Sequence, residues 1–338
     1  MNALSQSSLI AIIGAGAMGA GIAQVAAQAG HPVLLFDVRE GAAREAIDGI
    51  GRNLEKLVAR GRLDTAQAQR MLESLREIDS LEALADADLV IEAIIEDVTA
   101  KRELFLALEK HVRPDALLAT NTSSVSVTAI AAPLQYPNRF AGLHFFNPAP
   151  LMALVEIVSG LATSQDTRER LFDTAHAWGK EQVHARSTPG FIVNRVARPF
   201  YAEGLRLVEE GVVDVATLDA LLREGGGFRM GPFELMDLIG HDVNAAVTRS
   251  VFEAYAYDPR FKPSLLQQEL VAAGRLGRKS GQGFYRYAEA AVRPLPQQIS
   301  SAASAAVCVV EGELGIAREL LPRLREHGVE VIQRDGSG

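Results

Sequence analysis

Short apolar runs alternate with helix-prone segments through the first half of the chain. The runs end in glycine or in a polar residue, which is typical of the short, fully buried strands of a parallel sheet. Repeated alternation of this kind predicts an α/β fold with a doubly wound sheet of the Rossmann type. The strands are expected at 9–13, 32–36, 88–93, 116–119 and 182–185, and the helices at 20–29, 40–76 with a turn at Gly61, from Glu96 past Lys101, and at 164–178.

The alternation stops at Thr188-Pro189-Gly190, where we expect a domain boundary. Beyond it, up to about residue 273, apolar residues recur at helical spacing, with Ile192, Val196, Phe200 and 205–208 on one stripe. The sequence therefore predicts a Rossmann-type domain over 1–187, followed by an all-helical second domain over 188–288.

The last part of the chain has a different character. Residues 289–304 are rich in Pro, Gln, Ser and Ala and are interpreted as a linker. A strand at 306–310, a helix at 316–325 and a strand at 329–332 are expected within 305–338. A βαβ fragment of this size cannot cover both faces of its own sheet. We expect it either to pack on the main body or to begin an extension that this chain cuts short.

Composition narrows the possible functions. With 48% hydrophobic and 22% charged residues, the chain has the composition of an ordinary globular protein. The net charge of −8 argues against nucleic acid or an anionic membrane as a partner. The single cysteine, Cys308, allows no intrachain disulfide, and the histidines show no metal-ligand spacing, so we expect no metal and a reducing, cytoplasmic location. The apolar run 9–13 is too short for a membrane span, and no basic segment precedes it as in a signal peptide.

A glycine-rich loop follows the first expected strand. Gly14, Gly16 and Gly19 have the GxGxxG spacing, which needs a preceding strand and a following helix to indicate a dinucleotide site, and both are expected here. Glycines allow a tight turn and let a pyrophosphate approach the N-terminus of the helix. Asp37 closes the second strand and would accept hydrogen bonds from the ribose hydroxyls of adenosine while repelling a 2′-phosphate. The loop therefore predicts NAD rather than NADP, although Arg39 nearby keeps NADP open. Met18, within the loop, is included among the cofactor-binding candidates.

A histidine and a glutamate close two further apolar runs. His144 follows 140–143, Glu156 follows 153–155, and Pro148 and Pro150 interrupt the connection. Two short strands joined in this way can place imidazole and carboxylate side by side at one sheet edge. A carboxylate that holds one ring nitrogen leaves the other free to take a proton, as a general base does. A buried histidine beside an unrelated glutamate would explain an isolated pair equally well, but the dinucleotide loop upstream favours the catalytic interpretation.

Two polar segments are candidates for ligand contacts. The run 120–124 follows the strand expected at 116–119, and ligands bind at the carboxyl ends of strands in open α/β sheets. We expect Ser123 in the same crevice as His144 and count Asn121 as a cofactor candidate, although an ordinary turn explains such a run about as often. Lys56, Arg60 and Arg62 form a basic cluster near Gly61, which either binds phosphate or is a solvated helix face.

Eight motifs follow one another from about Leu9 to Tyr287: GAGAMG, EAIIED, NTSS, RFAGLHFFNP, LVEIV, TPGFIVNR, MGPFELMDLIG and LGRKSGQGFY. In this order they resemble one family, the NAD-dependent L-3-hydroxyacyl-CoA dehydrogenases of the 3-hydroxybutyryl-CoA and 3-hydroxyadipyl-CoA type.

The resemblance implies an enzyme that oxidises (S)-3-hydroxyacyl-CoA with NAD⁺, in fatty acid metabolism or phenylacetate degradation, as a homodimer formed through the helical domain. It implies His144 as the base with Glu156 as its partner, and Ser123 and Asn194 around the 3-oxygen and thioester of the substrate. The implied cofactor residues are Gly14, Gly16, Gly19, Asp37, Glu96 and Lys101, and the substrate candidates also include Asn147.

Two departures from the family pattern stand out. Residues 52–62 lack a clean match to the basic residues that hold coenzyme A in relatives, and Arg60 or Arg62 is expected to substitute. The tail after Tyr287 exceeds the two-domain pattern. Two alternatives remain: an NAD-dependent dehydrogenase of a free hydroxy acid or sugar acid, and a non-catalytic NAD-sensing module.

Overall fold

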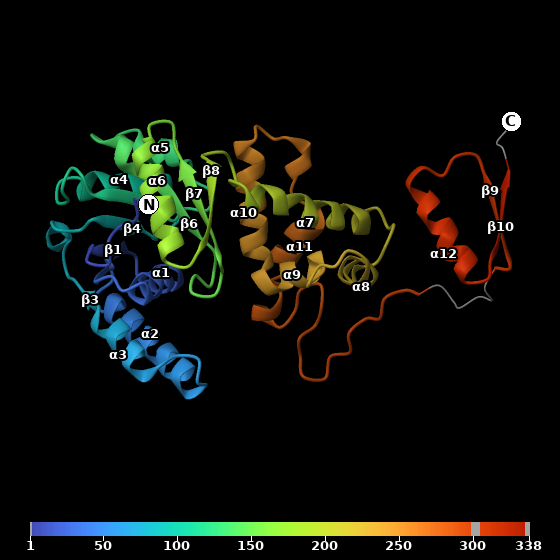
Figure 1. Cartoon of the computed structure of the whole chain (residues 1–338), viewed down its shortest axis with the longest axis horizontal. Helices are drawn as coiled ribbons and strands as arrows, with labels where there is room; N and C mark the ends of the chain where they lie inside the picture. The colour runs from blue at the N-terminus through green and yellow to red at the C-terminus, as the bar shows by residue number, and fades with distance from the viewer. Residues whose placement is uncertain (1, 299–304, 335–338) are drawn as a thin grey trace. The chain divides into compact units, whose positions relative to one another are not determined.

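The computed structural model describes residues 2–298 and 305–334, and the chain divides into two compact units, 1–293 and 294–338 (Figure 1). The residues at 299–304, the second part of the expected linker, lie outside the described residues.

An eight-stranded sheet with the order β3-β2-β1-β4-β5-β6-β7-β8 is the centre of the first unit. Neighbouring strands are parallel except β6 and β7, which are antiparallel, and β8 runs parallel to β7. This mostly parallel sheet with flanking helices confirms the predicted Rossmann-type fold. The strands are β1 (Ile10–Ile13), β2 (Val33–Phe36), β3 (Leu75–Glu77), β4 (Leu89–Glu92), β5 (Leu117–Thr120), β6 (Phe140–Phe145), β7 (Leu154–Ser159) and β8 (Glu181–Arg186).

Helices cover both faces of this sheet, and each face has its own apolar core. Strand β1 shows why its run is apolar throughout: Ile10 and Ile12 pack in one core, and Ala11 and Ile13 pack in the other. Burial on both faces removes the polar alternation of a half-exposed strand. The helices of this part are α1 (Ala17–Gln28), α2 (Ala42–Ala59), α3 (Thr65–Glu73), α4 (Val98–Leu108), α5 (Val127–Ala131) and α6 (Gln165–Ala177).

The rest of the first unit is helical, as predicted. Its core includes Tyr201, Leu205, Phe233, Met236 and Tyr285. The helices are α7 (Val193–Glu209), α8 (Val215–Ala220), α9 (Pro232–Ile239), α10 (His241–Ala254) and α11 (Leu265–Ala272).

A buried carboxylate fastens the segment after α11 to this helical part. Asp237 on α9 accepts main-chain N–H bonds from Phe284 and Tyr285, both at 2.9 Å, and the hydroxyl of Tyr287 at 2.8 Å. It also accepts a bond of 2.7 Å from Nε2 of His241. Because one side chain gathers these donors, the segment, whose own regular structure includes a short 3-10 helix at Arg278–Ser280, is tied to α9.

Three details differ from the predictions. Residues 75 and 76, expected at the end of a helix, belong to strand β3, which forms by pairing with β2. On the expected apolar stripe, Leu205 is buried, but Val196 is 70% exposed. Strand β8 lies outside β7, so the His144 and Glu156 strands are not at the side edge of the sheet.

The second unit contains a strand–helix–strand arrangement, as expected from the sequence. Strand β9 (Val307–Glu311) pairs in parallel with β10 (Glu330–Arg334), and α12 (Leu320–Glu326) connects them. Over the part of the chain that the structure describes, no helix is both long and apolar enough to cross a membrane.

Candidate active site

His144 and Glu156 face each other across the antiparallel pair β6 and β7. They are directly opposed in the strand register, and Nδ1 of His144 lies 2.6 Å from Oε2 of Glu156. The imidazole is 4% exposed and the carboxylate is fully buried. Cross-strand pairing thus brings together two residues that are twelve positions apart in sequence.

The second carboxylate oxygen of Glu156 binds the start of helix α7. Oε1 accepts the main-chain N–H groups of Ile192 at 2.9 Å and Val193 at 3.0 Å. These donors lie at the positive end of the helix, which attracts negative charge. An ionised Glu156 can only accept, so it holds Nδ1 of His144 as the N–H donor and leaves Nε2 as the basic nitrogen.

Nε2 of His144 has no hydrogen-bond partner among residues 2–298 and 305–334, and the ring borders a cavity of about 540 Å³. The rings of Phe146 and Phe191 lie 4.5 and 5.5 Å from the imidazole, measured between ring centroids. The cavity gathers residues from β6, from helices α1, α4, α7, α9 and α10, and from the segments that follow β4 and β5. Eight of the predicted site residues line it: Met18, Glu96, Lys101, Asn121, Ser123, His144, Asn147 and Asn194.

Two asparagines connect the parts of this cavity. Oδ1 of Asn121, just after β5, accepts the main-chain N–H of Phe145 at 2.8 Å, which ties the ends of β5 and β6 together. Nδ2 of Asn194 on α7 lies 3.4 Å from the carbonyl oxygen of Ser123. Ser123 and Asn194, expected near the same substrate groups, are therefore neighbours.

Lys101 is buried between two carboxylates. Its Nζ lies 2.6 Å from Oε1 of Glu92 and 3.2 Å from Oε2 of Glu96. Glu92 is fully buried, and its Oε2 accepts the hydroxyl of Thr120 at 2.6 Å. Glu92 is not among the residues proposed from the sequence. Its position as an acidic residue at the end of an otherwise apolar strand could have indicated it.

Glu96 also organises the turn after β5. Its Oε1 accepts N–H bonds from Ser123 at 2.7 Å and Ser124 at 2.9 Å, and the hydroxyl of Thr122 at 2.7 Å. Burial alone would raise the pKa of Glu96, but the charge of Lys101 and these hydrogen bonds outweigh it and hold the pKa below its ordinary value. The polar run 120–124 is thus a turn built on an ionised carboxylate.

The glycine loop has the shape that a dinucleotide pyrophosphate needs. A Cβ at Gly14 would lie 2.5 Å from the carbonyl oxygen of Ala93, and one at Gly19 would lie 1.7 Å from that of Gly14. A Cβ at Gly16 would meet nothing within 4 Å, so this position opens onto free space at the start of α1. No side chain in the described part of the chain caps the start of α1, so the first N–H groups of this helix are available to an anion. Asp37 lies beside the loop, where its Oδ2 accepts the N–H of Ala15 at 2.7 Å.

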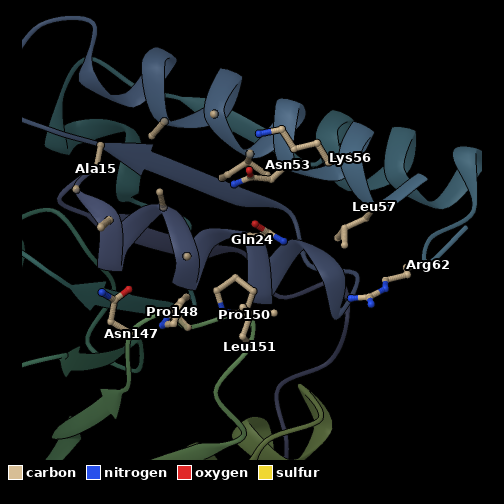
Figure 2. A pocket seen from close by; sticks show the side chains of 18 of the residues that line it. Ala15, Gln24, Asn53, Lys56, Leu57, Arg62, Asn147, Pro148, Pro150 and Leu151 are labelled. Atoms are coloured by element: carbon tan, nitrogen blue, oxygen red, sulfur yellow. The ribbon is translucent and has the colours of Figure 1, made fainter. Parts of the chain in front are cut away.

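A second cavity, of about 680 Å³, lies between α1, α2 and the connection from β6 to β7. Figure 2 shows Asn53 and Lys56 on α2, Gln24 on α1, and Pro148 and Pro150 on the connection. Lys56, Arg60 and Arg62 all line this cavity, and none of them forms an ion pair with a described residue. Asn147 lines both cavities, so they meet at this residue.

The described residues contain no group of three or more His, Cys, Asp or Glu side chains that could hold a metal ion. The arrangement instead offers a base beside a largely apolar cavity, with an anion-binding loop and a basic second cavity next to it.

Two family models match the chain in succession. The model of the NAD binding domain of 3-hydroxyacyl-CoA dehydrogenase matches residues 9–188, and the model of the C-terminal domain of 3-hydroxyacyl-CoA dehydrogenase matches residues 190–287.

Individual relatives agree with these matches. The chain is 56% identical over 276 residues to 3-hydroxyadipyl-CoA dehydrogenase of Escherichia coli (strain K12), which covers 82% of this chain and 58% of that protein. It is 40% identical over 284 residues to the mitochondrial hydroxyacyl-coenzyme A dehydrogenase of Sus scrofa, which covers 82% of this chain and 90% of that one. The chain therefore spans a little over half the length of the first of these relatives.

A solved structure, 3-hydroxybutyryl-CoA dehydrogenase from Escherichia coli K12 substr. MG1655, is also similar to the chain. It superposes with a TM-score of 0.84 at 44% sequence identity, and the match covers 98% of this chain and 81% of that one.

Proposed function

The chain belongs to the 3-hydroxyacyl-CoA dehydrogenase family, whose cofactor is NAD, and we propose that it oxidises (S)-3-hydroxyacyl-CoA to 3-oxoacyl-CoA with His144 as the general base. One observation carries this proposal. The imidazole of His144 is buried and held by Glu156, and its Nε2, which has no partner among the described residues, lies at the wall of the cavity that Ser123 and Asn194 also line.

His144 removes the proton of the 3-hydroxyl group as the alcohol becomes a ketone. NAD⁺, when bound, supplies the acceptor for the hydride that leaves carbon 3. An imidazole can be neutral before the reaction and charged after it, as a general base must be. Glu156 fixes the tautomer of the imidazole and stabilises the imidazolium that forms.

Ser123 and Asn194 orient the substrate. Nδ2 of Asn194 lies 3.4 Å from the carbonyl oxygen of Ser123, and both residues line the cavity. The amide of Asn194, and the hydroxyl of Ser123 once it turns from Oε1 of Glu96, can donate hydrogen bonds to the 3-oxygen and the thioester oxygen. Gly14, Gly16, Gly19 and Asp37 bind the adenosine and pyrophosphate half of the dinucleotide, while Met18, Glu96, Lys101 and Asn121 border its nicotinamide half.

The second cavity binds coenzyme A. Lys56, Arg60 and Arg62 supply local positive charge on a protein whose net charge is −8, and phosphate groups need such a region. The contact of the two cavities at Asn147 supports a path for the thioester arm from one to the other.

We also propose the domain division at 187/188, a cytoplasmic homodimer, and a role in phenylacetate degradation or fatty acid metabolism. The dimer is supported by large apolar side chains that the helical part exposes, including Val196, Phe228 and Leu265. The location is supported by the single cysteine, which is free.

The deciding experiment follows NADH consumption with acetoacetyl-CoA. Turnover that is lost in His144→Gln supports the proposal. Tight NADH binding without turnover of any thioester contradicts it and favours an NAD-sensing module. Faster reaction with free acetoacetate than with the thioester favours the alternative of a free-acid dehydrogenase.

A further inference from the structure

Arg198 on α7 lines the same cavity as His144, but none of the roles above uses it. Its side chain is 5% exposed, and no Asp or Glu among the described residues forms an ion pair with it. Buried arginines are normally paired with a carboxylate, because moving a charge out of water costs several kcal/mol. An unpaired cation at the wall of a ligand cavity therefore indicates an anionic ligand.

The hydrogen bonds of Arg198 leave one side of the guanidinium open. Nε lies 3.3 Å from the carbonyl oxygen of Asn194, and Nη1 donates to the carbonyl oxygen of Asn244 at 3.2 Å and to the hydroxyl of Thr248 at 2.9 Å. All three acceptors are neutral. Nη2 has no acceptor in residues 2–298 or 305–334, so the guanidinium is held in place with one nitrogen uncommitted.

A second unpaired donor lies next to it. Asn244 on α10 is 1% exposed and lines the same cavity. Its Oδ1 accepts a bond from Gln267 at 3.1 Å, whereas Nδ2 is buried and has no hydrogen-bond partner among the described residues. A buried donor left unpaired costs about 1–3 kcal/mol, so this position also calls for an acceptor.

Tyr201, whose ring centroid lies 4.8 Å from Cζ of Arg198, and Thr248 are polar side chains beside these donors, and other neighbours are apolar. Ala197 on α7, Ile239 on α9, and Val243 and Val247 on α10 line the cavity together with Arg198 and Asn244. Methylene groups suit such a lining, and a carboxylate suits its two unpaired donors. A chain of methylenes that ends in a carboxylate would satisfy both.

The spacing along α7 fits this assignment. Arg198 follows Asn194 by four residues, so both lie on one face of the helix, about 6 Å apart along its axis. Asn194 lies beside Ser123, where the proposed function puts the reacting end of the acyl group. A carboxylate a few carbons beyond carbon 3 would thus reach Arg198.

We propose that Arg198, with the amide of Asn244, binds a carboxylate at the far end of the acyl chain, and that the preferred substrates are dicarboxylic acyl-CoA thioesters. This proposal rests on the acyl-CoA dehydrogenase function proposed above.

The test compares two thioesters of equal carbon number in the direction of NADH oxidation. 3-Oxoadipyl-CoA ends in a carboxylate, 3-oxohexanoyl-CoA ends in a methyl group, and acetoacetyl-CoA reports the basic activity. We expect the native chain to show the higher kcat/KM for 3-oxoadipyl-CoA. Arg198→Met should lower the ratio of the two kcat/KM values about 10- to 100-fold, the cost of one charged hydrogen bond. Arg198→Lys, which keeps a cation, should retain part of the preference.

Arg206→Met is the matched control, because it makes the same change on the same helix at an exposed residue paired with Glu203. It should leave the ratio unchanged. If Arg198→Met lowers the unfolding temperature too far for assay, Asn244→Asp carries the test, since its like charge should also lower the ratio.

The outcomes separate the two proposals. A native ratio near one, or equal losses on both thioesters in Arg198→Met, overturns carboxylate binding while acetoacetyl-CoA turnover still supports the dehydrogenase. An unchanged ratio in Asn244→Asp also overturns it. No turnover of any thioester overturns the dehydrogenase function itself.

Discussion

Glu156 in the sheet accepts the main-chain N–H of Val193, at the first turn of helix α7, over 3.0 Å. The other oxygen of this carboxylate holds Nδ1 of His144 at 2.6 Å. One side chain therefore sets both the orientation of the proposed base and the position of the helix that carries Asn194 and Arg198.

Replacing Glu156 by glutamine should cut kcat about 10²- to 10⁴-fold, the usual contribution of a general base. An amide has a single oxygen, so it cannot accept from both Nδ1 of His144 and the N–H groups of α7. If the amide nitrogen faces the imidazole, it donates to Nδ1. The ring proton then sits on Nε2, and Nε2 can no longer accept the proton of the substrate. The measurement is kcat with acetoacetyl-CoA beside the unfolding temperature. A lower unfolding temperature with unchanged kcat would show that Glu156 is structural only.

His144→Gln should reduce kcat by a similar factor, about 10²- to 10⁴-fold, because the variant lacks any group that takes the hydroxyl proton. NADH affinity, measured by fluorescence titration, should stay within a few-fold of the native value. The matched control is His176→Gln, which makes the same change at an exposed position of α6. Native-like turnover in His144→Gln would end its assignment as the base.

Replacing two glycines of the loop by alanine should affect different properties, NADH affinity at Gly16 and stability at Gly19. Gly16→Ala should leave the unfolding temperature unchanged, because its Cβ would enter open space, and should raise the Kd for NADH by filling that space. Gly19→Ala should lower the free energy of unfolding by about 1–3 kcal/mol or more, because its Cβ would overlap a main-chain oxygen. Equal NADH affinity in Gly16→Ala and the native protein would argue against pyrophosphate binding at this loop.

Steady-state assays should show a preference for NADH over NADPH. The carboxylate of Asp37 lies against the glycine loop, where it would face the adenosine ribose and repel a 2′-phosphate. Asp37→Asn keeps an oxygen for the N–H of Ala15 but removes the charge, so the ratio of kcat/KM for NADH to that for NADPH should fall. A native preference for NADPH would contradict this role of Asp37.

Acid should reveal the contribution of Asp237 to stability. Burial alone would raise the pKa of this carboxyl, but hydrogen bonds from His241, Tyr285, Phe284 and Tyr287 outweigh burial and hold the pKa below its ordinary value. The unfolded chain therefore takes up the proton first as pH falls, so the stabilisation is complete above the unfolded pKa of about 3.9 and is lost as pH falls through the folded pKa.

Asp237→Asn should lower the free energy of unfolding at neutral pH by about 1–3 kcal/mol for each buried donor it leaves unpaired. The difference in urea midpoint between the native protein and the variant should shrink below about pH 4. A difference that stays constant across the acid range would show that ionisation of Asp237 does not stabilise the fold.

Most of the sheet could be predicted because its central strands are buried on both faces and are apolar throughout. Leu75-Arg76-Glu77 carries no such signal: this strand exists because β2 offers it an unpaired edge, which is a tertiary cause. The helical part was predicted by periodicity, yet periodicity does not tell which apolar residues are covered, and Val196 is exposed.

The pairing of His144 with Glu156 could be expected because both residues end adjacent apolar runs. Arg198 and Asn244 carried no comparable signal. Their proximity depends on α10 packing beside α7, and in the sequence Arg198 resembles any arginine on a helix. The ion pair between Nζ of Lys101 and Oε1 of Glu92 shows the same limit, since the burial of this pair comes from the sheet and α4 together.

The connection between β6 and β7 lines both cavities, whereas the strands on either side of it set the register of His144 with Glu156. Substitutions at exposed positions of this loop, such as Leu151, should therefore leave the proton-transfer pair in place, whereas Ala149 is buried and its carbonyl oxygen accepts from Nζ of Lys180 at 2.7 Å. Substrate fit and acid–base chemistry are encoded in separate, adjoining stretches of the chain. A chain with this fold could thus change how it holds coenzyme A while keeping its proton-transfer pair, and exposed loop positions such as Leu151 are the natural place for a library that alters coenzyme A binding.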